Sequence, residues 1–297
     1  MKPKAHQLTF QVNKGEEGLL REFLLHFQQI SRRSLSQIKH AGKLEVNGEE
    51  VTVRAPVKEG DTVVVTYPIE EESTYLTPEN IPLDIIYEDD FVLLINKPPG
   101  LCVHPTYNQS SGTLANAVMY HWKKKGWQRT FHAVNRLDRD TSGIVLIAQN
   151  RYSHQQLSQQ QKDKTLVRRY DAFVHGCLNQ ETGVIEAPIA RAKDSLIERE
   201  VNAEGQYART EYEVRQYNEA AGYTWVKVQL KTGRTHQIRV HFAYIGHPLL
   251  GDDLYGGTQS LIGRQALHAY YTSFQHPHTG EHMAFEAPLP HDLGRLV

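Results

Sequence analysis

The chain has 297 residues, of which 39% are hydrophobic and 23% are charged, and its formal net charge at pH 7 is −1. This length allows a sizeable core and favours one large domain with a smaller one attached, whereas the near-zero charge excludes a polycation that binds nucleic acid over its whole surface. No apolar run is long enough to cross a bilayer and the amino terminus has no apolar signal-peptide core, so we expect a cytoplasmic protein without membrane attachment.

The first predicted elements are two helices. Apolar residues recur from Gly18 onward at three- and four-residue spacing, which is typical of a helix that packs on a core, and they are Leu19, Leu20, Phe23, Leu24 and Phe27. A second, shorter helix is predicted over 34–40.

The segment KLEVNGEEVTV predicts a β-hairpin. Leu44 and Val46 alternate with polar residues, Asn47-Gly48 favours the positive backbone angles of a two-residue turn, and the alternation resumes over 51–53. A further strand over 63–67 would close a unit of two helices and a small sheet.

Residues 16–67 resemble the small RNA-binding fold first described in a ribosomal small-subunit protein, through SRRSLSQIKHAGKLEVNG and KEGDTVVV. In that family the two helices present basic side chains to RNA, and here these would be Arg32, Arg33 and Lys39. The alternative is a helix pair that only packs on its neighbour. We assign this domain to residues 1–67, and the acidic, Pro-flanked stretch that follows predicts a linker over 68–80.

The remaining residues, 81–297, predict a strand-rich domain. IIYEDDFVLLINKPPG indicates a hairpin, GIVLIA a strand buried on both faces, and YDAFVHG, TEYEVRQY and YTWVKVQL further strands. Helices are predicted over 114–124, over 153–162 with Ser153 as cap, and after Gly233. We therefore expect an α+β fold: a mixed, mostly antiparallel sheet domain preceded by a small two-helix plus β-hairpin RNA-binding domain.

The sequence lacks the motifs of nucleotide cofactors and of closed zinc sites. There is no Gly-rich dinucleotide fingerprint and no phosphate-binding loop, so we expect no cofactor. His276, His278 and His282 have no metal-ligand spacing, so we expect no metal. Cys102 and Cys177 are expected to be reduced, inert core thiols.

The segment HAVNRLDRDTSGIVLIAQN places Arg136 and Asp138 directly before an apolar strand. A surface pair of this kind is common and contributes only about 0 to 1 kcal/mol, whereas a buried carboxylate needs a cation. A second segment, LKTGRTHQIRVHFAYIGHPLLGDDLYG, predicts a helix start at which Arg234 and free backbone donors favour an anion such as a phosphate. Arg239, about a turn further along, is the predicted partner of Asp138.

These segments together resemble the pseudouridine synthases of the RluA type. That family is marked by His-Arg-Leu-Asp-x-x-Thr-Ser-Gly, which corresponds here to 135–143 with Asn135 in place of the usual His. Four further segments also match the family: RRYDAFVHG, which has basic residues before Tyr170, and TGRTHQIRVH, GHPLLGDDLYG and LHAYYTSFQHP. The resemblance covers about 81–290. The chain departs from the family motif at Asn135, where an amide cannot accept a proton as an imidazole can.

The resemblance implies an isomerase that detaches uracil from ribose, turns it and reattaches it through a ring carbon, without a cofactor. Asp138 would be the catalytic carboxylate, either attacking the anomeric carbon or removing a proton from the neighbouring ribose carbon. Arg239 would keep it ionised, and Tyr170 would pack on the everted uracil. Arg136 would enter the RNA stack, and the basic residues Arg168 and Arg234 are expected to contact RNA as well.

The expected partner is RNA, with large-subunit ribosomal RNA ahead of transfer RNA, and we expect a monomer without an obligate protein partner. Two other functions compete. A glycosidase or nucleosidase needs a second carboxylate, which Asp140 or Asp252 would supply. A non-catalytic RNA-binding or ribosome-assembly factor would leave the site idle.

Overall fold

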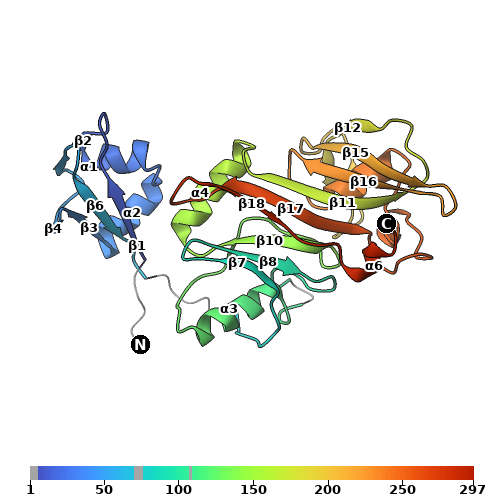
Figure 1. Ribbon diagram of the computed structural model, residues 1–297, viewed down its shortest axis with the longest axis horizontal. Coiled ribbons are helices and arrows are strands. Elements are labelled where there is room, and N and C mark those ends of the chain that lie inside the picture. The colour runs from blue at the N-terminus through green and yellow to red at the C-terminus, as the bar shows by residue number, and fades with distance from the viewer. Residues whose placement is uncertain (1–5, 70–75, 107–108) are drawn as a thin grey trace.

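The structure is a computed structural model that describes residues 6–69, 76–106 and 109–297. Figure 1 shows a small N-terminal unit at one end of an elongated molecule, with helix α4 of the larger unit facing it. The elements of the N-terminal unit are β1 (Gln7–Gln11), β2 (Gly18–Leu19), α1 (Leu20–Glu22), a π-helical turn (Phe23–Phe27), α2 (Arg32–Ala41), β3 (Lys43–Val46), β4 (Glu49–Glu50), β5 (Pro56–Val57) and β6 (Thr62–Thr66).

The N-terminal sheet has the order β1-β6-β3-β4 with antiparallel neighbours, and β2 pairs separately with β5. The predicted hairpin is confirmed, because Val46 pairs with Glu49 across a two-residue turn. Asn47 and Gly48 have the positive φ angles that this turn requires, 53° and 85°. Strand β4 ends at Glu50, earlier than the alternation predicted, and β1 was not predicted at all.

The first helix is shorter than the apolar spacing predicts. Leu19 lies in β2, so the helix begins at Leu20, and its last turn widens because the Gln28 amide donates to the Phe23 carbonyl (3.1 Å). Leu19 and Phe27 are 44% and 45% exposed, so their predicted place in the core is wrong. Helix α2 begins two residues earlier than predicted.

The larger unit is α+β, as predicted. Its helices are α3 (Leu114–Lys124), α4 (Arg151–Lys162), α5 (Gln237–Tyr244), α6 (His291–Gly294) and a 3₁₀ turn (Asp253–Tyr255). Its strands are β7 (Ile85–Glu88), β8 (Val92–Lys97), β9 (His132–Ala133), β10 (Ser142–Ala148), β11 (Val167–His175), β12 (Thr182–Glu186), β13 (Ile189–Arg191), β14 (Arg199–Val201), β15 (Arg209–Asn218), β16 (Tyr223–Leu230), β17 (Leu267–Gln275) and β18 (His282–Glu286).

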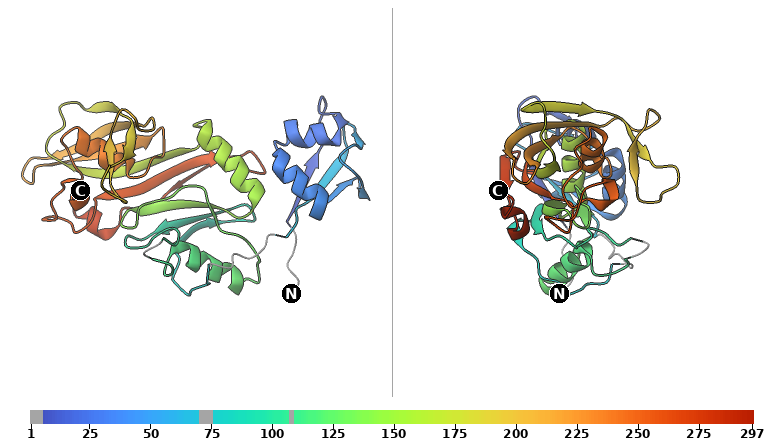
Figure 2. Two further views of the ribbon diagram at one scale, coloured as in Figure 1. Left: turned by 180° about the vertical axis from the view of Figure 1, so that it is seen from behind. Right: turned by 90° about the vertical axis from the view of Figure 1, so that its right-hand side faces the viewer.

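The main sheet is mixed and mostly antiparallel, as predicted. Its order is β12-β15-β16-β11-β17-β10-β8-β7, with β18 beside β17 and β9 beside β10, and β10 with β17 is its parallel pair. Every residue of β10 is buried: Trp122 of α3 packs in the core on one face, and Leu157 of α4 in the core on the other. Figure 2 shows these two helices on opposite sides of the sheet.

The helix boundaries follow their caps. The predicted bounds of α3 are confirmed, and Thr113 caps this helix by accepting from the Asn116 amide. Helix α4 begins at Arg151 because Asn150, rather than the predicted Ser153, is the cap; the Asn150 side chain accepts from the Ser153 amide.

One aromatic side chain joins the two units. Tyr152 of α4 is 5% exposed and belongs to the hydrophobic core of the N-terminal unit, where its ring lies near those of Phe10 and Tyr67. No helix within the described residues is long and apolar enough to cross a membrane. Both cysteines are free, but Cys177 is exposed just after β11, so its predicted core position is wrong.

Candidate active site

A small cavity lies where β10 and β17 begin. Its volume is about 60 Å³. The side chains around it come from the 136–141 turn, from β11, from the end of β16 and from the start of α5, and they are Arg136, Leu137, Asp138, Thr141, Tyr170, Leu230, Arg234, His236, Gln237, Ile238, Arg239 and Leu267. The structure therefore brings together five of the predicted site residues: Arg136, Asp138, Tyr170, Arg234 and Arg239.

Close strand packing forms the turn that carries Asp138. The Thr141 amide donates to the Asp138 carbonyl (3.2 Å), which closes the turn before β10. Gly143 follows with φ of 112°, and a Cβ atom there would lie 2.2 Å from the Ala269 carbonyl oxygen of β17. Only glycine permits both this angle and this approach, so the motif glycine sets how closely the turn lies to β17.

Two cations bind the backbone of this turn. Lys97 is fully buried, and its ammonium donates to the carbonyls of Pro98 (2.9 Å), Leu101 (2.8 Å) and Arg139 (2.9 Å). Burial lowers the pKa of Lys97 to about 7. Arg264 donates to the Asp140 carbonyl (3.0 Å) and pairs with Asp292 of α6 (2.7 Å). Both carbonyls that follow Asp138 are therefore fixed by side chains from distant segments.

Arg239 of α5 links two carboxylates. Its Nε and Nη2 atoms each lie 2.7 Å from an oxygen of Asp252, and its Nη1 atom donates to Asp138 Oδ2 (3.1 Å). The Arg239 side chain is 7% exposed and that of Asp252 is fully buried. Burial works to lower the pKa of Arg239, but the hydrogen bonds and charges of the two carboxylates outweigh it and raise the pKa. The guanidinium is therefore a permanent charge beside Asp138.

Asp138 is only partly shielded, which corrects the expectation of a buried carboxylate. Its side chain is 27% exposed and lines the cavity. Arg239 contacts one carboxylate oxygen, and His236 Nε2 lies 3.8 Å from the same oxygen. Arg239 and His236 thus orient the carboxylate, which stays accessible from the cavity.

Tyr170 lies in β11 at a β-bulge. The pairing of β11 with β17 shifts register between Arg169 and Asp171, and such bulges redirect side chains at functional sites. The ring is 4% exposed and lines the cavity. Burial raises the pKa of its hydroxyl, and the positive charge of Arg168 only partly offsets this, so the phenol is neutral at pH 7.

The predicted RNA-binding residues fall into two regions. Arg136 is exposed at the cavity, and Arg234 also lines it while donating to the Tyr207 carbonyl (3.0 Å). The backbone amide of Arg234 is not free as predicted, because it donates to Gln237 Oε1 (3.0 Å). The Arg168 guanidinium lies within 4 Å of the position a side chain would take at Gly233. The other three, Arg32, Arg33 and Lys39, are exposed on α2 in the N-terminal unit and do not line the cavity.

Three further residues complete the site, and the sequence indicated none of them in the roles they have here. Asp252 holds Arg239, Tyr255 packs its ring under the Arg239 guanidinium (4.9 Å), and His236 lies 2.8 Å from the Tyr255 hydroxyl through Nδ1. Burial lowers the pKa of His236 although the charge of Asp138 opposes this, so the ring is neutral at pH 7. Asp252 and Tyr255 belong to the segment GDDLYG, in which no local pattern marks a contact with Arg239.

Asn135 does not line the cavity. Its Nδ2 donates to the Ile144 carbonyl (3.2 Å) and its Oδ1 accepts from the Leu146 amide (2.8 Å), so the side chain imitates a paired strand beside β10. A neutral imidazole also offers one donor and one acceptor. The Asn135 side chain therefore has a structural role at this position.

The hydrolase alternative lacks an available second carboxylate. Asp252 is fully buried and occupied by Arg239, while Asp140 pairs with Arg139 (3.0 Å), and neither lines the cavity. Over residues 6–69, 76–106 and 109–297, no three His, Cys, Asp or Glu side chains are grouped to hold a metal ion. The arrangement therefore presents to the cavity the carboxylate of Asp138, the Arg239 guanidinium beside it and the buried phenol of Tyr170.

Comparisons with known proteins agree on one family. Residues 91–244 match the family described as RNA pseudouridylate synthase. The chain is 51% identical over 269 residues to a Bacillus subtilis protein named uncharacterized RNA pseudouridine synthase YjbO, a match that covers 90% of this chain and 94% of that protein. It is 37% identical over 286 residues to ribosomal large subunit pseudouridine synthase D of Pasteurella multocida, covering 91% and 87% of the two chains.

The solved structures show the same fold. Human RNA pseudouridylate synthase domain containing 1 superposes with a TM-score of 0.57 at 24% identity and covers 74% of this chain and 87% of its own. The human domain-containing 4 protein gives the same TM-score at 21% identity, covering 71% and 90%.

Proposed function

This chain belongs to the RluA-type RNA pseudouridine synthase family and is an isomerase that acts on RNA, and we propose from this premise that Asp138 is its catalytic carboxylate. The observation that carries the proposal is the hydrogen bond from Arg239 Nη1 to Asp138 Oδ2, made by a guanidinium that Asp252 holds in place. A cation fixed in this way holds the Asp138 carboxylate in one orientation at the wall of the cavity.

The reaction breaks the bond between uracil and ribose and forms a carbon–carbon bond at the same sugar, with no net oxidation and no added atom. Asp138 acts as an anion, either by attacking the anomeric carbon or by taking a proton from the neighbouring ribose carbon. Both routes need a carboxylate that is ionised and exposed to the cavity, as the 27% exposure of Asp138 allows. The buried phenol of Tyr170 packs on the uracil ring and assists proton exchange at its carbon.

The target uridine leaves its RNA stack at a cost of a few kcal/mol before it reaches Asp138. Arg136 is exposed at the cavity, where a planar guanidinium fills the space that the everted base leaves. The cavity of about 60 Å³ is smaller than the 300–1,000 Å³ typical of small-molecule sites, so its walls open as the base enters. Arg168 and Arg234 contact the RNA backbone beside it.

The RNA-binding surface continues on a separate N-terminal domain. In this proposal the domain spans residues 1–67, a linker spans 68–80 and the catalytic domain spans 81–297; residues 1–5 and 70–75 lie outside the described part of the chain. Exposed Arg32, Arg33 and Lys39 of α2 contact phosphates. Large-subunit ribosomal RNA is the proposed substrate, because relatives such as the Pasteurella multocida protein carry that RNA in their names.

The decisive experiment replaces Asp138 alone. Unmodified large-subunit ribosomal RNA, transcribed with tritium at the fifth carbon of uracil, is incubated with the wild type and with Asp138→Asn. We expect the variant to release no tritium while its RNA affinity stays within about threefold. Asp140→Asn is the matched control, since that carboxylate pairs with Arg139 and does not line the cavity, and it should turn over normally.

Three outcomes would contradict parts of the proposal. Normal turnover by Asp138→Asn would remove Asp138 from catalysis. Free uracil in place of a modified RNA would indicate a hydrolase. Tritium release from transfer RNA but not from ribosomal RNA would replace the proposed substrate, and mapping pseudouridine in cells with and without the gene would locate the position.

A further inference from the structure

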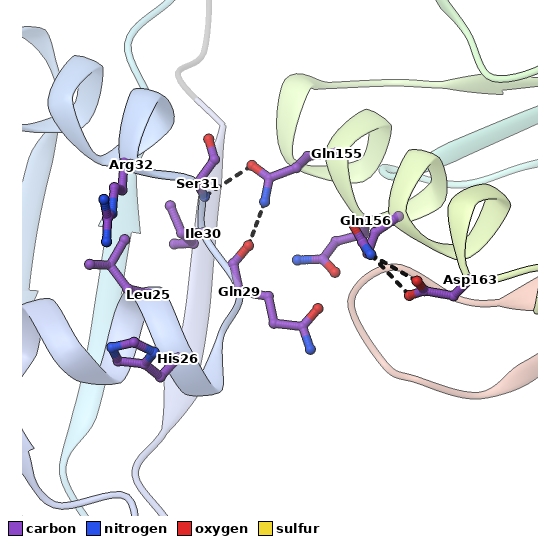
Figure 3. Close-up of a pocket in the computed structure, with 10 residues that line it drawn as sticks. Leu25, His26, Gln29, Ile30, Ser31, Arg32, Gln155, Gln156 and Asp163 are labelled. Atoms are coloured by element: carbon purple, nitrogen blue, oxygen red, sulfur yellow. Dashed lines mark hydrogen bonds between the residues drawn. The ribbon is translucent and has the colours of Figure 1, made fainter.

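A second cleft lies between the N-terminal unit and helix α4. Its volume is about 460 Å³, and Figure 3 shows side chains from both units facing each other across it. The residues that line it are Leu25, His26, Gln29, Ile30, Ser31 and Arg32 on the N-terminal side, and Gln155, Gln156 and Gln159 of α4 with its C-cap Asp163 on the other.

Hydrogen bonds to the backbone set the width of this cleft. Gln155 Oε1 accepts from the Ser31 amide (3.0 Å) and its Nε2 donates to the Gln29 carbonyl. Gln156 Nε2 donates to the Gln28 carbonyl (3.3 Å). Since Tyr152 anchors the same helix in the N-terminal core, the cleft is formed before any ligand arrives.

Several polar groups of the cleft have no partner within the described residues. The side chains of His26, Gln29 and Arg32 make no hydrogen bond or ion pair there, and Oε1 of Gln156 accepts none. In Figure 3 the amides of Gln29 and Gln156 extend into the gap from opposite walls. Gln29 has a positive φ of 52°, an uncommon conformation for this residue.

The chemistry of these groups selects the ligand. The carboxylate of the cleft, Asp163, accepts hydrogen bonds from Gln159 Nε2 at both of its oxygens (3.0 and 3.1 Å). An amide presents a donor and an acceptor side by side, as the edge of a nucleobase does. An unpaired guanidinium binds phosphate, and Leu25 and Ile30 add apolar surface.

Building on the proposed function, we propose that this cleft binds one unpaired nucleotide of the RNA substrate. The base lies between the Gln29 and Gln156 amides, and the phosphate lies on Arg32. The volume falls within the range of small-ligand sites, and α2 continues the positive surface outward through Arg33. A nucleotide held here, away from the catalytic cavity, would select RNA by the distance between its target uridine and a single-stranded position.

The test is photo-crosslinking of the full chain to unmodified large-subunit ribosomal RNA that contains 4-thiouridine. We expect crosslinked peptides that include 25–32 or 155–163. Gln29→Gly, which the positive φ accommodates without strain, should lower that yield at least fivefold, and Arg32→Ala should do the same. Gln28→Gly is the matched control, because the neighbouring Gln28 side chain does not line the cleft, and its yield should stay within twofold.

Crosslinks confined to other peptides, or equal losses with Gln28→Gly and Gln29→Gly, would overturn the nucleotide site. Thermal unfolding of each variant separates loss of binding from loss of folding. Tritium release by the wild type is measured on the same RNA preparation. An inactive wild type would contradict the proposed function, whereas an active wild type without crosslinks in the cleft contradicts this inference alone.

Discussion

The turn that carries Asp138 and helix α2 of the N-terminal unit use positive charge in opposite ways. Around the turn the cations are buried or nearly so, and their hydrogen-bonding groups are occupied by protein: Lys97 by three carbonyls and Arg239 by two carboxylates. On α2, Arg32, Arg33 and Lys39 are exposed, and none of them forms an ion pair within the described residues.

This difference separates the cations that position Asp138 from the cations that bind RNA. A desolvated cation needs several fixed partners, so the cations of the turn hold Asp138 in one geometry. A hydrated cation keeps its mobility and releases counterions when it meets a phosphate. Substitutions in the first region should therefore change stability and turnover, whereas substitutions in the second should change RNA affinity and its dependence on salt.

Arg239→Met should have the largest effect on the stability and the turnover of the protein. The change leaves Asp252 buried without a counter-charge, so the free energy of unfolding should fall by about 3–5 kcal/mol. Turnover should fall about 100-fold or more, because Asp138 loses the group that orients it. Urea unfolding and tritium release measure the two effects.

A second substitution distinguishes these effects. Adding Asp252→Asn to Arg239→Met removes the uncompensated charge and should recover part of the stability without recovering turnover. Recovery of both would mean that Arg239 supports the fold alone and that Asp138 does not depend on it.

Lys97→Met should alter the pH dependence of stability. Because the folded-state pKa is lowered to about 7 from the ordinary 10.5, the unfolded chain binds more protons than the folded chain between these values. The contribution of Lys97 to stability therefore rises with pH in this window, by about 1.4 kcal/mol for each pH unit. The difference in unfolding free energy between wild type and Lys97→Met, measured at pH 7, 8 and 9, should grow in favour of the wild type. A constant difference would show that Lys97 stays charged.

The triple variant Arg32→Ala, Arg33→Ala, Lys39→Ala should leave stability unchanged and weaken RNA binding about tenfold at low salt. The slope of log affinity against log salt concentration should decrease by about 2, since three phosphate contacts are lost. The matched control replaces three other exposed cations of the N-terminal unit, Arg21, Arg54 and Lys58. Equal effects of the two triple variants would assign binding to overall charge rather than to α2.

Asn135→His should have the smallest effect. Because a neutral imidazole, like the Asn135 amide, offers one donor and one acceptor to the two backbone groups of β10, turnover should stay within about threefold and stability within about 1 kcal/mol. Asn135→Leu, which offers neither bond, should lose more stability. A large loss of turnover in Asn135→His with normal stability would place this position in the reaction itself.

Local patterns predicted the elements that depend on neighbouring residues. Asn47-Gly48 favours a two-residue turn by its own residue types, and the apolar run of β10 identifies a buried strand directly. The ion pair between Arg239 and Asp138 was predicted because a shielded carboxylate needs a cation beside it. These predictions are confirmed because each rests on a short-range rule or on a single strong electrostatic requirement.

Features that depend on distant contacts were missed. Strand β1 exists because β6 has a free edge for it, and the first helix is shortened because Gly18 and Leu19 pair with β5. Asp252 was considered only as a second carboxylate, since nothing in GDDLYG shows that its side chain meets Arg239. The partial exposure of Asp138 likewise depends on how the turn lies against β17.

The position of Tyr152 limits how this protein can be recombined. Its ring completes the core of a unit that ends some eighty residues earlier in the chain. A chimaera that exchanges only the segment before the linker would therefore leave a void or a clash at this ring, and modular grafts should transfer the first turn of α4 together with the N-terminal segment.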